Sequence, residues 1–476
     1  MTIKALCIHG HFYQPPRQDV LTGIIPQEMG TAPYKNWNEK IHAECYRPNA
    51  ELGNFEHISF NIGPTLFQWM ENYDPVTYKL IIGQDRVNFE RHGVGNAMAQ
   101  PYNHTILPLA NQRDKVTQIE WGIADYIHRF GHSPAGMWLP EAAVDKQTMR
   151  ILADHGIEYT VLAPWQSDTQ DTNGKQPYRL SLGKNKSIAV FFYDMDLSTR
   201  VSFDPAATSD ADQFVTKFIA PNFQKNDQSG KPEILIIASD GELYGHHQPF
   251  RDKFLARLLD GASNMRKIDI VYPGLYLQRY GVSASCRIKE RTSWSCHHGI
   301  SRWKTECGCT PHARWKAPLR DGLNRIARKL DQAYSKFLKS YTSDPWEVRN
   351  QYIRVHLGLV SWTDFAKQHF TGFLSSFDND RLQSIMQAQI ARQWMFTSCG
   401  WFFDEFDRIE PRNNVSYAAQ AVYLTEKATG NPLAAKSIKA LSLVQSERSG
   451  LRASDVFTET YQRCQTYDFD FLRAVV

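Results

Sequence analysis

The alternation of short apolar runs with helix-like segments is the feature of this sequence that most restricts its fold. Before about residue 285, seven apolar runs have the length of strands, and stretches of helical periodicity such as residues 111–131 separate several of them. The runs are residues 3–10, 57–63, 135–141, 158–164, 187–194, 233–240 and 268–274. This pattern is typical of a parallel sheet, closed or open, whose functional groups gather at the carboxyl ends of the strands.

The sequence changes character in its second half. From about residue 310 the strand-like runs stop, and residues 320–341, 384–398 and 414–430 carry apolar stripes of helical period. We therefore predict an α/β domain over residues 1–285 and an α-helical domain over residues 286–476 that closes over the cleft. Residues 168–185 are polar and rich in turn residues, which predicts an exposed loop or hairpin inserted in the first domain.

Charge and hydropathy exclude several classes of partner. The formal net charge is only +4 over 476 residues, and no Lys/Arg run occurs that would follow a phosphate backbone, so we expect no nucleic acid partner. No apolar run reaches 18 residues and the first residues lack a signal-peptide pattern, so we expect no membrane segment and a cytoplasmic location. The 12 Trp and 21 Tyr supply rings that either fill a core or stack on sugar faces.

The segments that end the expected strands are rich in ionisable and aromatic side chains. If the strands are parallel, these side chains converge on one face of the sheet, where a rigid scaffold presents reacting groups. The residues concerned are His9, His11, Gln14, Trp138, Glu141, Trp165, Asp194, Asp196, Arg200, Asp240, Glu242, His246 and His247.

Four of these segments carry a resemblance to a known family. In chain order they read HFYQPP from residue 11, MWLPE from residue 137, FFYDMDLSTRVSF from residue 191 and SDGELYG from residue 239. They resemble the motifs of glycoside hydrolase family 57, retaining α-glucan enzymes built on an incomplete (β/α)7 barrel followed by a helical domain. By motif the resemblance covers residues 1 to about 300, and the remainder is similar to a helical C-terminal extension found in one branch of that family.

The resemblance implies a function and roles for particular residues. It implies an α-amylase, a 4-α-glucanotransferase or a branching enzyme that needs no cofactor, with Glu141 as nucleophile and Asp240 as general acid/base. A retaining enzyme of this kind holds its two carboxyl groups about 5 to 5.5 Å apart. We expect the oligo- or polysaccharide substrate to contact His11, Gln14, Trp138, Trp165, Arg200, His246, Trp294, His298, Trp303 and Trp401.

Structural roles compete with these assignments. Glu141 could favour the start of a helix, Asp240 could cap one, and for Glu242 a structural role is the expected one. The sequence also departs from the family, because Tyr13 stands where many members carry a second histidine, which puts the identity of the substrate in question.

Two functions of other classes remain open. One is a metal-dependent carbohydrate enzyme of the polysaccharide deacetylase or zinc α-mannosidase type, in which His9, His11 and Asp240 bind the metal and a bound water attacks the substrate. That interpretation leaves Glu141 without a role. The other is a catalytically silent carbohydrate-binding protein that keeps the barrel and has lost turnover.

A cluster of potential metal ligands lies just beyond the expected barrel. The eight cysteines do not form the pattern of a disulfide framework, but the segment CHHGISRWKTECGC supplies Cys296, His297, His298, Cys307 and Cys309. These donors suffice for a tetrahedral zinc site, although the spacing is not that of two CxxC pairs. The alternative is an ordered loop whose cysteines pack as small apolar side chains.

Overall fold

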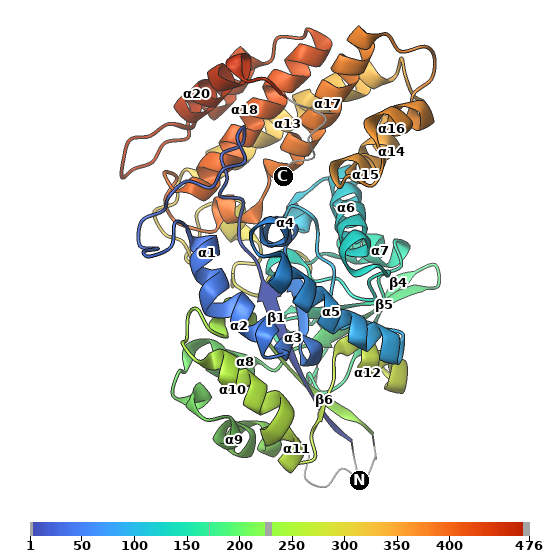
Figure 1. The fold of residues 1–476 in the computed structure, drawn as a ribbon, viewed down its shortest axis with the longest axis vertical. Coiled ribbons are helices and arrows are strands. Elements are labelled where there is room, and N and C mark those ends of the chain that lie inside the picture. The colour runs from blue at the N-terminus through green and yellow to red at the C-terminus, as the bar shows by residue number, and fades with distance from the viewer. Residues whose placement is uncertain (1–2, 171, 224–230, 470–476) are drawn as a thin grey trace. The chain divides into compact units, whose positions relative to one another are not determined.

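The computed structural model describes residues 3–170, 172–223 and 231–469 (Figure 1). The chain divides into two compact units. Unit 1 comprises Met1–Gln14, Gln27–Pro101 and Tyr126–Ser295, and unit 2 comprises Pro15–Pro26, Tyr102–Asp125 and Cys296–Val476. This division differs from the single boundary that we expected after residue 285. Two segments of the first half pack with residues of the second, and such long-range contacts leave no mark on local periodicity.

The core of unit 1 is built around a buried strand, β1 (Lys4–Phe12). β1 is parallel both to β2 (Ser59–Ile62) and to β6 (Glu233–Asp240), and its amino-terminal end also pairs with the two-residue strand β7 (Asp269–Ile270). A parallel strand covered on both faces is expected to be continuously apolar, and residues 5–8 are fully buried.

Single-residue bridges extend this sheet around the unit. The parallel bridges Phe60 to Ala97, Ala99 to Met137 and Gly136 to Tyr159 lead to β3 (Tyr159–Leu162). β3 is parallel to β5 (Lys186–Phe192), and the backbone N–H of Asp194 donates to the Ile236 carbonyl of β6 at 2.7 Å.

The described residues therefore trace a ring of parallel segments whose pairing is broken in places. This arrangement confirms the expected incomplete (β/α)7 barrel. Two details differ from the sequence prediction: residues 97–99 form a barrel segment that we did not predict, and the apolar run 268–274 contributes only the short β7.

Residues 178–192 form a hairpin that overlaps the loop or hairpin predicted over residues 168–185, and its second strand is the apolar run that we predicted as a barrel strand. β4 (Tyr178–Gly183) is antiparallel to β5, and β8 (Ala284–Cys286) is parallel to β4. Lys184 and Asn185 join β4 to β5 with φ angles of 52° and 59°, the left-handed conformation that tight hairpin turns favour. β4 alternates buried and exposed side chains, so one face of it is covered.

Helices surround the barrel strands of unit 1 (Figure 1). Several begin at an aspartate whose side chain accepts a backbone N–H, among them Asp74, Asp145 and Asp194. The helices are α1 (Trp37–Ile41), α2 (Arg47–Glu51), α3 (Asn54–His57), α4 (Pro64–Tyr73), α5 (Pro75–His92), α7 (Lys146–Asp154), α8 (Met195–Phe203), α9 (Ala211–Phe214), α10 (Arg251–Arg257), α11 (Ser263–Met265) and α12 (Pro273–Tyr280).

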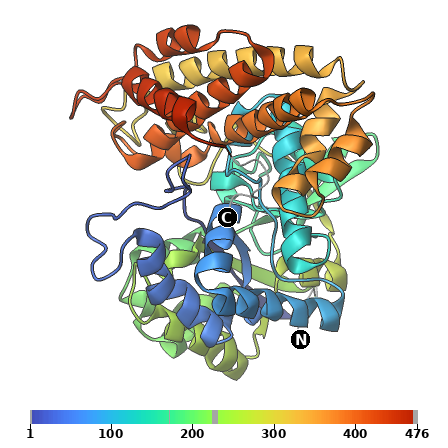
Figure 2. The ribbon, with the colours of Figure 1, turned by 45° about the horizontal axis from the view of Figure 1, so that its top comes forward.

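Unit 2 is helical, as predicted. The three apolar stripes correspond to α13 (Lys316–Leu338), α17 (Ser376–Trp394) and α18 (Ile409–Thr429), and α18 ends at Gly430 with φ 71°. Figure 2 shows these helices, yellow to red, packed side by side. The other helices are α14 (Pro345–Gln351), α15 (Ile353–His356), α16 (Trp362–His369), α19 (Ala434–Leu441) and α20 (Ala453–Thr466), and the first residues of α6 (Gln112–Phe130) also belong to this unit. In the part of the chain that is described, none of the helices has the length and hydropathy to cross a membrane.

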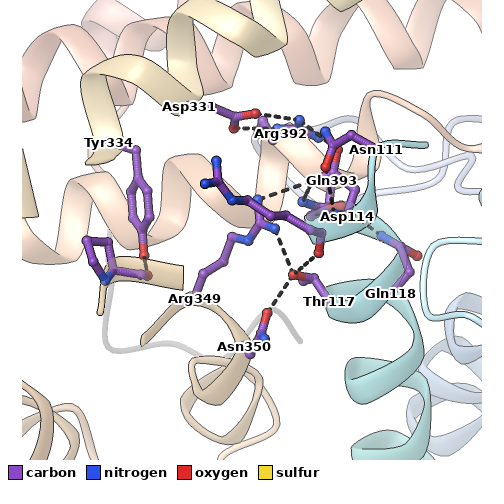
Figure 3. Close-up of polar contacts among 12 residues, drawn as sticks. Asn111, Asp114, Thr117, Gln118, Asp331, Tyr334, Arg349, Asn350, Arg392 and Gln393 are labelled. Atoms are coloured by element: carbon purple, nitrogen blue, oxygen red, sulfur yellow. Dashed lines mark hydrogen bonds and ion pairs between the residues drawn. The ribbon is translucent and has the colours of Figure 1, made fainter. Parts of the chain in front are cut away.

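A buried ion network holds α6 within unit 2 (Figure 3). The Asp114 carboxylate lies 3.2 Å from Nη1 of Arg349 and 2.8 Å from Nη2 of Arg392. Arg392 also donates two hydrogen bonds of 2.9 Å to the carboxylate of Asp331. The Arg349, Arg392 and Asp114 side chains are almost completely buried, so each charge depends on the others for compensation.

Replacing Asp114 with asparagine is therefore expected to destabilise unit 2. The change keeps the shape of the side chain but leaves two buried guanidinium groups undercompensated, which costs about 3–5 kcal/mol. Arg448→Gln is the matched control, because it removes the exposed arginine of an ion pair with Asp407 and should cost less than about 1 kcal/mol. Urea unfolding measures both, and equal shifts for the two variants would contradict a stabilising role for the network.

Candidate active site

Asp240 is the last residue of β6, directly beside His11 of β1 in the parallel register. The chain turns immediately after it at Gly241, where the Phe12 ring lies so close that a Cβ atom would collide with it. The Asp-Gly sequence thus allows the turn that leaves the Asp240 side chain exposed at the strand end.

Glu141 lies in a strained turn that follows the barrel segment at residues 136–137. Its φ is 57° and that of Ala142 is 46°, left-handed values that cost a non-glycine residue roughly 1–2 kcal/mol. The segment around Trp294 holds this turn, because the backbone N–H of Trp294 donates to the Glu141 carbonyl at 2.9 Å. Conformations of this kind persist where the surrounding structure imposes them, and they are concentrated at functional sites.

Two further donors fix the Glu141 carboxylate. Its Oε2 atom accepts hydrogen bonds from Nε1 of Trp294 at 3.0 Å and from Oγ of Ser295 at 2.7 Å. Because both partners donate, they suit an ionised carboxylate, which can only accept. The two hydrogen bonds therefore fix the orientation of the carboxyl group at the end of a barrel loop.

The Asp240 carboxyl has the opposite electrostatic character. Although part of the Asp240 side chain is open to solvent, the protein atoms packed around its carboxyl group, then the like charge of Glu242, then that of Glu141 raise its pKa to about 8. Solvent reaches the side chain at the strand end and screens part of this repulsion, but the direction of the shift keeps Asp240 protonated at a pH where an ordinary aspartate is ionised. His11 is paired with Asp240, Trp294 donates to Glu141, and the rings of His11 and Trp294 have centroids 6.3 Å apart, so the two carboxyl groups belong to one site.

Glu242 follows Asp240 by two residues and is buried. Its Oε1 atom accepts from the Tyr46 hydroxyl at 2.7 Å and from the Tyr13 backbone N–H at 3.1 Å. Burial raises the pKa of Glu242 to about 7, against the opposing effect of these hydrogen bonds. The contacts tie the end of β1 to residues 42–46 and fit the structural role that we expected.

Aromatic rings form the floor of the site. The rings of His9 and His11 stack on Trp138 with centroids 4.6 and 5.5 Å apart, and Trp294 meets Trp138 edge-on at 5.0 Å. Trp138 is fully buried, so its ring supports the neighbouring rings and, contrary to our expectation, offers no open face to a substrate. Burial lowers the pKa of His9 to about 3 and that of His11 to about 4, so both are neutral at pH 7 and neither offsets the raised pKa of Asp240.

The remaining expected contacts in unit 1 differ in their surroundings. Nε1 of Trp165 donates to the Ser293 carbonyl at 3.0 Å, and Gln14 donates to the Tyr46 hydroxyl at 3.1 Å, so both lie in the same network of loops as the carboxyl groups. His246 is hydrogen-bonded with Glu44. Arg200 instead pairs with Asp196 within α8, and its guanidinium lies 4.6 Å from the centroid of the Phe218 ring.

The expected substrate contacts in unit 2 are placed differently from our expectation. Trp303 and Trp401 are fully buried, and the Arg320 guanidinium lies 3.5 Å from the Trp401 ring centroid while donating to the Trp303 carbonyl. A ring that stacks on a sugar needs an exposed face. Because neither ring has one in this structure, neither can serve as a stacking platform. His298 is exposed, and its Nδ1 atom lies 3.5 Å from Sγ of Cys309.

Sequence reasoning missed several residues of the site. Ser295, which donates to Glu141, stands next to a tryptophan that we singled out, so its position was a usable signal. Tyr46 and Asn61, which hydrogen-bond with Glu242 and His11, lie in segments without any distinguishing motif.

The geometry offers no support for a metal at the strand ends. Nδ1 of His9 is hydrogen-bonded with Ser59 at 3.0 Å, and its ring stacks on Trp138. Over the described ranges, the His, Cys, Asp and Glu side chains that converge in a metal-binding arrangement lie in unit 2, and His9, His11 and Asp240 are not among them.

Enzymes that cleave glycosidic bonds commonly use a pair of Asp or Glu carboxyl groups, and Glu141 and Asp240 are such a pair at the strand ends of the barrel. Comparison with known families agrees with this class. The sequence model described as glycosyl hydrolase family 57 matches residues 14–284, more than half of the chain, and the chain belongs to this family. A second model, described as a domain of unknown function (DUF3536), matches residues 312–467.

Curated relatives match about half of the chain. Alpha-amylase 1 of Dictyoglomus thermophilum is 29% identical over 216 residues, which cover 44% of this chain and 29% of that protein. A 4-alpha-glucanotransferase of Thermococcus litoralis is 22% identical over 254 residues, 51% of this chain and 36% of that protein. The match thus spans only about a third of the length of these relatives.

Solved structures share the fold over nearly the whole chain. An exo-type maltose-forming amylase from Pyrococcus sp. ST04 superposes with a TM-score of 0.73 at 15% identity, covering 96% of this chain and 88% of that one. A family 57 branching enzyme from Pyrococcus horikoshii gives a TM-score of 0.62 at 15% identity, with coverage of 97% and 94%. At such identities the similarity concerns the fold alone.

Proposed function

We propose that this protein is a retaining enzyme acting on α-glucans by double displacement, with Glu141 as nucleophile and Asp240 as general acid/base. The observation that carries the proposal is the contrast between the two carboxyl groups. Two donors orient Oε2 of Glu141 as an acceptor, which suits an ionised carboxylate, while the protein atoms around Asp240 and the like charges of Glu242 and Glu141 raise the pKa of Asp240.

The proposed reaction has two steps. In the first, a Glu141 oxygen bonds to the anomeric carbon as the glycosidic bond breaks, and Asp240 transfers its proton to the leaving oxygen. In the second, the ionised Asp240 takes a proton from the incoming hydroxyl, whose oxygen displaces Glu141 from the anomeric carbon. Asp240 ends the cycle protonated, and the product keeps the anomeric configuration of the substrate.

Hydrolysis, glucan transfer and branching differ only in the second step. Water attacks in hydrolysis and a sugar hydroxyl attacks in the other two, so the choice depends on how far the site excludes water. Family relatives include alpha-amylases and 4-alpha-glucanotransferases, which supports α-glucans as the substrate class.

Product analysis tests the substrate class. The purified chain is incubated with maltoheptaose, amylose and glycogen, and the products are sized by chromatography. Hydrolysis gives only shorter chains, transfer gives longer and shorter ones together, and branching gives new α-1,6 linkages by NMR. A Glu141→Gln preparation purified in the same way controls for contaminating amylase.

Absence of products from every α-glucan, in a folded protein, would contradict the proposal. It would favour the silent carbohydrate-binding alternative if the same preparation still bound one of these glucans.

A further inference from the structure

Four potential metal ligands at the start of unit 2 converge on one point. They are Cys296, His298, Cys307 and Cys309, and their ligand atoms all lie within 4.8 Å of one another. None of them takes part in the proposed reaction. Cys296 and Cys307 are eleven residues apart, so the convergence results from the fold of the loop between them.

Two of the six separations are close to those of a tetrahedral zinc site, and the others are at most 4.8 Å. Ligands at Zn–S distances of about 2.3 Å and Zn–N distances of about 2.0 Å lie roughly 3.5–3.8 Å from each other. Sγ of Cys296 and Sγ of Cys307 are 4.0 Å apart, and Sγ of Cys309 is 3.5 Å from Nδ1 of His298. We propose that these four side chains bind one structural zinc ion.

The backbone of the loop is shaped for this arrangement. The Thr310 N–H donates to the Cys307 carbonyl at 2.9 Å and closes a tight turn through Gly308, which places the thiols of Cys307 and Cys309 on the same cluster. A Cβ atom on Gly308 would lie 3.1 Å from Cε1 of His298, so the glycine allows the imidazole ring to approach the turn.

The surroundings suit a negatively charged centre. Three thiolates and a neutral imidazole around Zn²⁺ carry a net charge of about −1. Lys316 is completely buried and donates to Oγ1 of Thr310 at 2.9 Å, and Thr310 in turn lies 3.8 Å from Sγ of Cys307. A buried ammonium group needs a negative partner, and the zinc-thiolate centre supplies one through this hydroxyl.

Four protein ligands complete the coordination shell, so the role is structural and no position is left open for substrate. The ion would hold residues 296–309 together. These residues precede α13, and the regular structure described among them is the short 3-10 helix Ser301–Trp303. A Cys296–Cys307 disulfide is the competing chemistry, but it would need sulfurs about 2.05 Å apart and would leave Cys309 and His298 unused.

Metal analysis of the full chain tests the proposal. After expression with added zinc, removal of any affinity tag and dialysis, elemental analysis should find about one zinc per chain. Cys307→Ser and Cys309→Ser should lose most of it, whereas Cys399→Ser and His297→Ala, which lie outside the cluster, should retain it. A wild-type content near zero, or equal zinc in all variants, would overturn the site.

Cobalt substitution keeps the test independent of variants that fail to fold. Wild-type protein reconstituted with Co²⁺ should show the thiolate-to-cobalt charge-transfer band and the intense d–d absorption of a tetrahedral thiolate site. Absence of both bands, or a Cys296–Cys307 disulfide in the mass spectrum of the purified protein, would contradict the proposal. Glu141→Gln protein should bind zinc normally, so the outcome does not depend on the proposed function.

Discussion

Replacing Glu141 with glutamine is expected to lower turnover by roughly three orders of magnitude or more while the protein stays folded. Glutamine keeps the volume of the side chain and still accepts from Trp294 and Ser295, so the strained turn at residues 141–142 should persist. The amide cannot attack the anomeric carbon, and the glycosyl-enzyme therefore does not form. Steady-state kinetics on a maltooligosaccharide, with circular dichroism to check the fold, measures the effect.

Azide provides the second arm of this experiment. With an activated glycosyl donor, the small anion can attack the anomeric carbon of the sugar bound to the Glu141→Gln variant and should restore part of the rate, giving a glycosyl azide of inverted configuration. Glu290→Gln is the matched control, because Glu290 is an exposed carboxylate in the loop before Trp294. Wild-type turnover in the Glu141→Gln variant would remove Glu141 from the mechanism.

Replacing Asp240 with asparagine should abolish the alkaline limb of the pH profile. The raised pKa of Asp240 keeps the acid protonated at neutral pH, so activity is present below this pKa and is lost as pH rises through it. Asparagine has no such titration. The loss should be about 10²- to 10⁴-fold on natural glucans and much smaller on aryl glycosides, whose leaving groups need no proton.

Glu242→Gln is the control for this experiment. The charge of Glu242 is the largest like-charge contribution to the raised pKa of Asp240, so removing it should move the alkaline limb to lower pH without abolishing it. If Asp240→Asn slows aryl glycosides and natural glucans equally, Asp240 is not the acid, and Glu242 or a histidine of the same strand end takes its place as candidate.

The fold was predictable because barrel strands leave a local signal. Continuous apolar runs predicted β1 and β6, and their parallel arrangement follows from the helices between them. Residues 97–99 were missed because their pairing consists of isolated bridges in the segment NAMAQ, which is too short and too polar to register as a strand. Periodicity reports which side of an element is buried, and it does not report which distant segment covers it.

The same limit explains the errors within the site. Tryptophan is a residue type that often stacks on sugars, which is why we expected Trp303 and Trp401 to contact the substrate. In the structure, Arg320 and the core of unit 2 enclose both rings. The effect of the Glu242 charge on the pKa of Asp240 is larger than that of Glu141, and it depends on how the turn at Gly241 places a side chain two residues away. Such placements depend on tertiary contacts.

The most direct test of the account is to trap the glycosyl-enzyme. The wild-type chain is treated with a 5-fluoro-α-glucosyl fluoride, which slows the second step, and the labelled peptide is identified by mass spectrometry. The account predicts one glycosyl group per chain, attached through an ester to Glu141, and no label in the Glu141→Gln variant. A label on another carboxylate would contradict the assignment of the nucleophile, and turnover without any covalent intermediate, together with a product of inverted anomeric configuration, would contradict the double-displacement mechanism.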